Sequence, residues 1–153
     1  MYDFPKNRGR SGLPLMSLAM QLGAIEKQIR CYGTDVPIHM AEIHMIKAIK
    51  EMDGIHGMGL AEFFGITRGA VSQTLLKLER KGLVEKEPHS ANLSRLRLKL
   101  SAKGETAYAH HEQLHDLFDQ AVEAELSHHP DAFRETLASF LRSMQDALSS
   151  FNG

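Results

Sequence analysis

Apolar residues recur at two different spacings along this chain, and the two spacings predict different structures. A spacing of three or four residues, typical of one helix face, marks residues 17–32, 39–52, 60–64, 68–81, 102–126 and a last segment from about residue 133 to 151. Between residues 83 and 100 the spacing changes to two on either side of a turn-rich stretch, which predicts a β-hairpin. A short β-branched and glycine-flanked stretch over residues 55–58 predicts one further strand. Residues 1–16 show no period and are expected to form a flexible arm.

The segment around residues 60–86 carries the most information about function. A tight turn at Gly65-Ile66 separates two predicted helices, Thr67 offers its hydroxyl as the N-cap of the second, and Gly82 follows the end of that helix. The apolar positions of the second helix define its inner side, and the helical period then places five other residues outward: Arg68, Gly69, Ser72, Gln73 and Lys77. Two short helices followed at once by a hairpin form a winged helix-turn-helix, in which the second helix enters the major groove of DNA.

The element order predicts a mainly α fold with a small β-wing. Residues 38–102 form the winged helix-turn-helix DNA-binding domain, and residues 17–37 with 103–153 form a helical dimerisation region. The outer helices have more apolar surface than one small domain can cover, so we expect a homodimer.

Charge and composition narrow the class of protein. Between residues 66 and 104 nine basic residues stand against three acidic ones, a net charge of +6, and the rest of the chain carries −7. A basic segment in an acidic chain fits one face for a polyanion. The single cysteine excludes an intrachain disulfide, and no signal peptide or membrane span is evident, so a cytoplasmic protein without membrane partners is expected.

The outward residues of the second helix suit recognition of duplex DNA. Gln73 can pair with adenine and Arg68 with guanine or a phosphate, whereas Lys77, Arg80 and Lys81 are expected to bind phosphates. Small residues at positions 69 and 70 let the helix N-terminus approach the backbone closely.

The chain resembles the MarR family of regulators over residues 38–108, in the pattern LAEFFGITRGAVSQTLLKLERKGLVEK followed by LRLKLSAKG. The resemblance implies a homodimer that binds pseudo-palindromic DNA, acts as a repressor and responds to a ligand. It places Arg68, Ser72, Gln73 and Lys77 in the recognition helix, and Arg95 and Arg97 in the wing. Where the family often carries Asp-Arg-Arg at the wing tip, this chain has Asn92-Leu93-Ser94, so its wing reaches the groove with fewer charges.

Nine histidines suggest a metal as the effector. His111 and His115 are four residues apart and share a helix face, as helical metal ligands must. The resemblance to zinc-responsive relatives is closest at His44, His111 and His115, with Cys31 and Glu42 nearby. Zinc is thus a candidate effector, and no cofactor is required.

Other effectors and one enzyme activity remain as alternatives. The same region could accept a small aromatic or acidic molecule in an apolar pocket lined by Met16, Met20, Met40, Met45 and Phe118. An oxidant could act through Cys31, although no second cysteine is present to form a disulfide. Residues 111–115 also match the HExxH pattern of zinc hydrolases, but the third ligand and substrate-binding strand of a protease are not evident, so we expect no enzyme.

Overall fold

The computed structural model describes residues 12–89 and 92–150, without the side chains of residues 13, 88–89 and 92–96. The chain divides after His111 into two compact units, Met1–His111 and Glu112–Gly153, and each is described by itself. No helix in these described ranges is both long enough and apolar enough to cross a membrane.

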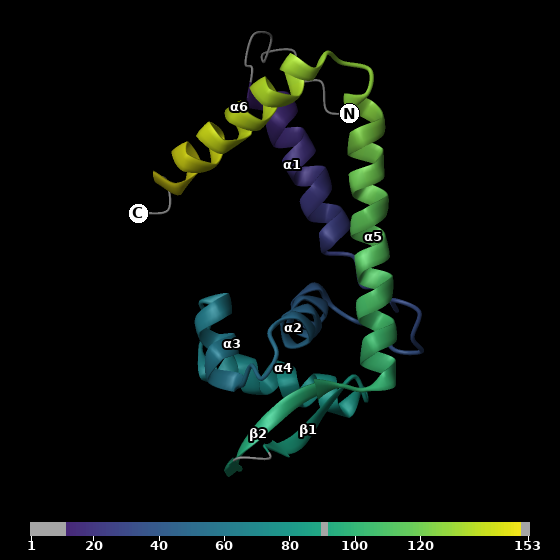
Figure 1. The fold of residues 1–153 in the computed structure, drawn as a ribbon, viewed down its shortest axis with the longest axis vertical. Helices are drawn as coiled ribbons and strands as arrows, with labels where there is room; N and C mark the ends of the chain where they lie inside the picture. Colours follow the sequence, from purple (N-terminus) through teal and green to yellow (C-terminus); the bar gives the residue numbers. More distant parts are fainter. Residues whose placement is uncertain (1–11, 90–91, 151–153) are drawn as a thin grey trace. The chain divides into compact units, whose positions relative to one another are not determined.

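Six helices and one hairpin follow one another in the described parts of the chain (Figure 1). They are α1 (Gly12–Glu26), α2 (Met40–Glu51), α3 (Gly57–Phe64), α4 (Arg68–Arg80), β1 (Val84–His89), β2 (Asn92–Leu100), α5 (Ala102–Leu126) and α6 (Asp131–Ser149). This order confirms the predicted mainly α fold with a small β-wing.

The helix-turn-helix is bounded by the local features that the sequence predicted. Gly65 ends α3 in the left-handed conformation (φ 61°), which glycine adopts without a Cβ clash. The Thr67 hydroxyl then accepts a hydrogen bond from the Ala70 amide at 3.2 Å and caps α4. Gly82, also left-handed (φ 67°), follows the last turn and directs the chain into β1.

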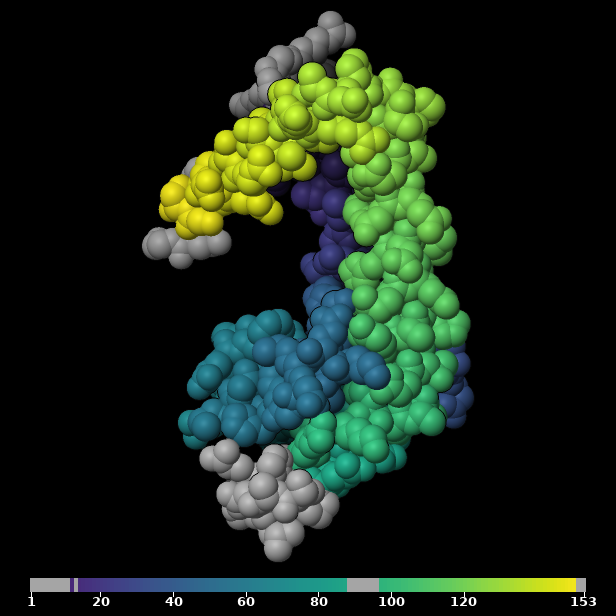
Figure 2. All heavy atoms as spheres, viewed as in Figure 1, coloured from purple at the N-terminus to yellow at the C-terminus, as the bar shows by residue number. Residues whose placement is uncertain are grey.

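The core of the first unit lies where α2, α3, α4 and the hairpin meet. Its completely buried side chains include Ile46 of α2, Leu60 of α3, Leu78 of α4 and Leu83 before β1. In the space-filling view the atoms of α2, α3 and α4 form one continuous packed surface, drawn in blue and teal (Figure 2). This core holds α4 by its apolar side and leaves its other side in solvent.

The hairpin is antiparallel, and its alternation follows the predicted period of two. Val84 pairs with Leu100 and Lys86 with Leu98, and the three aliphatic side chains are buried. Glu85 and Lys99 form the intervening pair on the solvent side. The wing is therefore anchored in the core through one face.

Two sequence expectations for the elements were wrong. First, α1 begins at Gly12, inside the predicted arm, because Pro14 lies in the first turn, where no helical hydrogen bond needs its missing N–H. It also ends at Glu26 rather than near residue 32, since Arg30 forms a β-bridge with Ile38 and Tyr32 has a positive φ of 45°. Second, the strand over residues 55–58 is absent from the described structure. Gly57 opens α3 instead, and His56 Nδ1 accepts from the Gly59 amide at 3.2 Å.

Candidate nucleic-acid interface and histidine cluster

The outer side of α4 presents the residues that the sequence placed there. Val71, Leu75 and Leu78 are buried, at 1%, 6% and 0% exposure. Arg68, Gly69, Ser72, Gln73 and Lys77 are all exposed. The predicted orientation of the helix is therefore confirmed. Thr67 is exposed as well, but its hydroxyl is engaged as the helix cap.

Ion pairs neutralise much of the basic segment and leave α4 as the exception. Three of its bases pair with acids elsewhere in the chain, in the pairs Lys81–Glu42, Arg97–Asp53 and Lys103–Asp35. Two more pair within the segment, as Lys86–Glu79 and Lys99–Glu87. No ion pair among the described residues involves Arg68, Lys77 or Arg80. Among the described side chains of this segment, the cations available to a polyanion are thus concentrated on α4.

The guanidinium of Arg68 has one contact that bears on its role. One of its nitrogens lies 3.1 Å from the sulfur of Met58 in α3. Because a thioether is a weak acceptor, this contact orients the guanidinium without engaging its charge. Arg68 is therefore oriented from α3 and still available to a stronger partner.

One wing arginine, Arg97, lies among the described side chains. Arg97 is exposed on β2 and its guanidinium pairs with the carboxylate of Asp53, which follows α2. The side chains of Arg95 and of Asn92-Leu93-Ser94 at the predicted wing tip lie outside the described residues. Arg97 thus ties the wing to the turn after α2.

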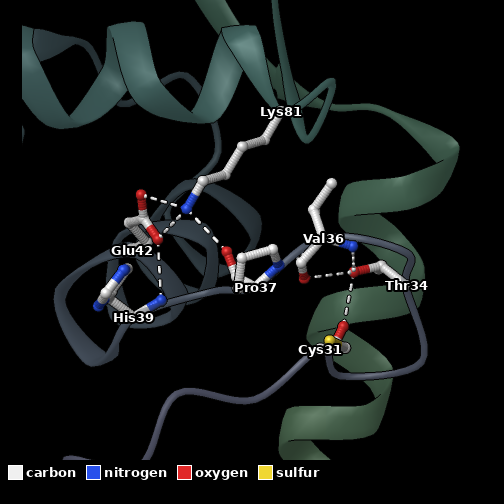
Figure 3. Close-up of polar contacts among 7 residues, drawn as sticks. All are labelled: Cys31, Thr34, Val36, Pro37, His39, Glu42 and Lys81. Atoms are coloured by element: carbon white, nitrogen blue, oxygen red, sulfur yellow. Dashed lines mark hydrogen bonds and ion pairs between the residues drawn. The ribbon is translucent and has the colours of Figure 1, made fainter.

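Lys81 turns inward, in contrast to the expectation that it binds phosphate (Figure 3). Its ammonium donates to both carboxylate oxygens of Glu42, at 2.8 and 2.6 Å, and to the carbonyl of Pro37 at 2.8 Å. The backbone amide of His39 donates to the same carboxylate at 2.8 Å. Burial by itself raises the pKa of Glu42, but the His39 amide and the hydrogen bonds and charge of Lys81 outweigh it, so the pKa lies below its ordinary value.

The histidine cluster combines one buried ring with neighbours that are half-buried or, at His115, exposed. His111 is buried, and its ring centroid lies 5.8 Å from that of His44 and 5.7 Å from that of Tyr32, both edge-on. Along α5, ligand atoms of His111, Glu112 and His115 all lie within 4.8 Å of one another, a spacing that one metal ion could bridge.

The other predicted metal ligands do not join this group. Cys31 is exposed, and its carbonyl accepts from the Thr34 hydroxyl at 2.6 Å. The carboxylate of Glu42 is occupied by Lys81. Glu112, which the sequence suggested only as part of an enzyme motif, takes their place in the described grouping. Among the residues of the predicted apolar pocket, Met45 belongs to the core, whereas Met16, Met20 and Phe118 are exposed.

Comparison with known proteins agrees with this architecture. Residues 36–92 match the model of the MarR family. The chain is similar in structure to Streptococcus pneumoniae FabT in complex with DNA, with a TM-score of 0.73, 21% identity, and coverage of 93% of this chain and 97% of FabT. It is also similar to Staphylococcus aureus MepR bound to ethidium bromide (TM-score 0.65, 18% identity, covering 93% and 99%). A third similar structure is the zinc-responsive MarR family member ZitR of Lactococcus lactis (TM-score 0.67, 16% identity, covering 88% and 99%). No curated protein matches the sequence significantly. The chain therefore has the winged-helix fold of the MarR regulators.

Proposed function

We propose that this protein is a MarR-family transcriptional regulator that binds pseudo-palindromic duplex DNA as a homodimer and acts as a repressor. The observation that carries the proposal is the outer side of α4. It combines an exposed amide, Gln73, with three cations that have no ion pair among the described residues, on a capped helix held by the core. An amide can read an adenine edge, and the cations can hold the backbone on either side. The likeness to FabT, whose structure contains DNA, supports the same use of the fold.

The proposed second copy accounts for apolar side chains that a single chain leaves in solvent. In α6 these are Phe133, Phe140, Leu141 and Leu148, which are between 40% and 54% exposed. In α1, Met16, Leu18, Met20 and Ile25 are more than half exposed. Several exposed apolar side chains along each of two long helices are typical of an interface between protomers.

Operator binding tests the proposed function directly. A duplex is selected from a random library with the wild-type protein, and its affinity is measured by fluorescence anisotropy. Arg68→Ala and Gln73→Ala should each weaken binding to this duplex by about 1–3 kcal/mol, because each removes a base contact. Gln120→Ala, which removes an exposed glutamine from α5, is the matched control and should leave the affinity unchanged. Unchanged affinity in both α4 variants would refute α4 as the recognition helix.

We further propose zinc as the effector, held by His111 and His115 with His44 beside them. The grouping of His111, Glu112 and His115 supports this, as does the likeness to zinc-responsive ZitR. Zinc bound here changes DNA affinity only if it binds one conformation of the dimer better than another. With Glu112, the grouping has an HExxH pattern. We propose that this grouping senses zinc and does not catalyse a reaction.

Metal analysis and paired substitutions test the zinc proposal. The protein purified without chelator should contain zinc, and added zinc should change operator affinity in the wild type. His111→Ala with His115→Ala should abolish the change, whereas His128→Ala with His129→Ala, outside the grouping, should preserve it. If zinc never alters the affinity of the wild type, the alternative of a small aromatic or acidic effector is favoured. MepR, which was solved with ethidium bromide, shows that this fold can bind such a molecule. An effect of peroxide that Cys31→Ser abolishes would instead favour the oxidant.

A further inference from the structure

We propose that Glu42 and Lys81 are positioning residues for the recognition helix: their buried ion pair fixes the C-terminal end of α4 against the first turn of α2. The inference rests on the proposed function for its meaning in DNA binding. It concerns two residues that touch no DNA in this arrangement, because the ammonium of Lys81 points into the protein (Figure 3).

The burial of this pair distinguishes it from the others in the described structure. The side chains of Lys81 and Glu42 are 22% and 5% exposed, whereas those of Arg97 and Asp53 are 46% and 88% exposed. Buried charges are screened little by salt and are held by specific hydrogen bonds. Here one ammonium satisfies two carboxylate oxygens and the Pro37 carbonyl, so three acceptors from the start of α2 and the segment before it converge on it.

The two residues also lie at the helix ends that favour their charges. Glu42 is in the first turn of α2, where the backbone dipole favours an anion, and it is fixed there by the His39 amide. Lys81 is the C-cap residue of α4, where the dipole favours a cation. The pair therefore joins the positive end of one helix to the negative end of the other.

Loss of this attachment would matter because α4 is long, so that a small tilt moves its far end by more than the length of a hydrogen bond can vary. Its 13 residues span about 20 Å. If its C-terminal end were released, a tilt of about 5° would displace that end by roughly 2 Å, more than a hydrogen bond tolerates. Lys77 and Arg80 lie in the last turn and have long side chains that can still follow the phosphates, whereas the short amide of Gln73 would be displaced from its base edge.

The test compares two paired substitutions that remove equal charge. Glu42→Gln with Lys81→Met removes the buried pair, and Glu79→Gln with Lys86→Met removes a more exposed pair that also includes a residue of α4. We expect the first variant to bind the selected operator at least tenfold more weakly than the wild type. Its affinity for random duplex and its dependence on salt should be unchanged. The control should lose less than threefold.

A direct phosphate contact would give a different result. If Lys81 bound phosphate, its loss would weaken binding to both duplexes and reduce the slope of log K against log salt by about 0.9 per contact. That result, or unchanged operator affinity in the folded double variant, would overturn the proposal. If the double variant does not fold, Glu42→Gln alone is tested in its place. A loss of less than threefold in operator affinity would then overturn the positioning role of the pair.

A second measurement is independent of DNA. Amide hydrogen exchange in the free protein should be at least tenfold faster at residues 77–83 in the buried-pair variant and unchanged in the control. Equal protection in the two variants would overturn the positioning role. A wild type that binds no duplex selectively would instead refute the proposed function, and the exchange data would still decide whether the pair holds α4.

Discussion

Replacing Gly104 by alanine should destabilise the protein, although the same change in a helix usually stabilises. Gly104 lies in the first turns of α5, and its amide donates to the Ser101 hydroxyl at 3.0 Å. A Cβ at this position would overlap the carbonyl oxygen of Leu83 and would lie 3.1 Å from the carbonyl carbon and 3.2 Å from Leu100 Cβ. Leu83 is completely buried, so its backbone has little room to move.

The opposing contributions can be estimated separately. The helix preference of alanine over glycine favours the variant by about 1 kcal/mol. Displacing the Leu83 carbonyl by roughly 1 Å overpacks a filled core, which costs about 1–3 kcal/mol. It also breaks the hydrogen bond from the Ser101 amide to Leu83 O, at 3.1 Å, which costs about 1 kcal/mol more. The expected net destabilisation is about 2 kcal/mol, or roughly 4–8 °C in Tm for a chain of this size.

Thermal and urea unfolding followed by circular dichroism would measure this effect at one fixed protein concentration, since the proposed dimerisation would link stability to concentration. Gly23→Ala is the matched control. Gly23 lies within α1, and a Cβ there meets no atom within 4 Å, so this variant should gain about 0.5–1 kcal/mol. Equal stabilisation by both substitutions would show that a Cβ at residue 104 does not clash with the Leu83 carbonyl.

Two further predictions concern α4 and its buried pair. Gly69→Ala should stabilise the free protein by about 0.5–1 kcal/mol, because its Cβ would meet only the Thr67 hydroxyl at 3.9 Å. The same variant should bind the operator more weakly, because the N-terminus of α4 could no longer approach the DNA backbone so closely. An unchanged affinity in fluorescence anisotropy would exclude this close approach. The low pKa of Glu42 predicts that its contribution to stability is complete above the ordinary carboxyl pKa and is lost as pH falls through the lower folded-state value. The free energy of unfolding, measured with urea between neutral pH and about pH 3, should therefore fall less steeply with pH in Glu42→Gln with Lys81→Met than in the wild type. Equal slopes in the two proteins would contradict the pKa shift.

The elements that the sequence predicted well are those defined by local chemistry. Thr67 as a cap, Gly65 and Gly82 as helix ends and the alternation of residues 97–100 depend on a few neighbouring residues, and all appear as expected. The orientation of α4 followed because its aliphatic residues recur at one period.

What the sequence could not predict depends on pairs that are distant along the chain. Lys81 and Glu42 are 39 residues apart, and nothing local distinguishes Lys81 from Lys77, which remains exposed. A weak indication did exist at Glu42, since an acid three residues after His39 suits the first turn of a helix. The end of α1 was missed for a similar reason, because the bridge between Arg30 and Ile38 overrides the helical period there.

The pairing of five bases of the basic segment with carboxylates has a consequence for how the protein finds its site. With Arg68, Lys77 and Arg80 as the cations on α4 without an ion pair, the described part of each chain in the proposed dimer should displace few counterions from random duplex. Its residence on non-target sequence should then be brief, so that it travels mainly by repeated dissociation and re-encounter and slides only over short distances. Most of the free energy of binding would be gained on arrival at the correct bases.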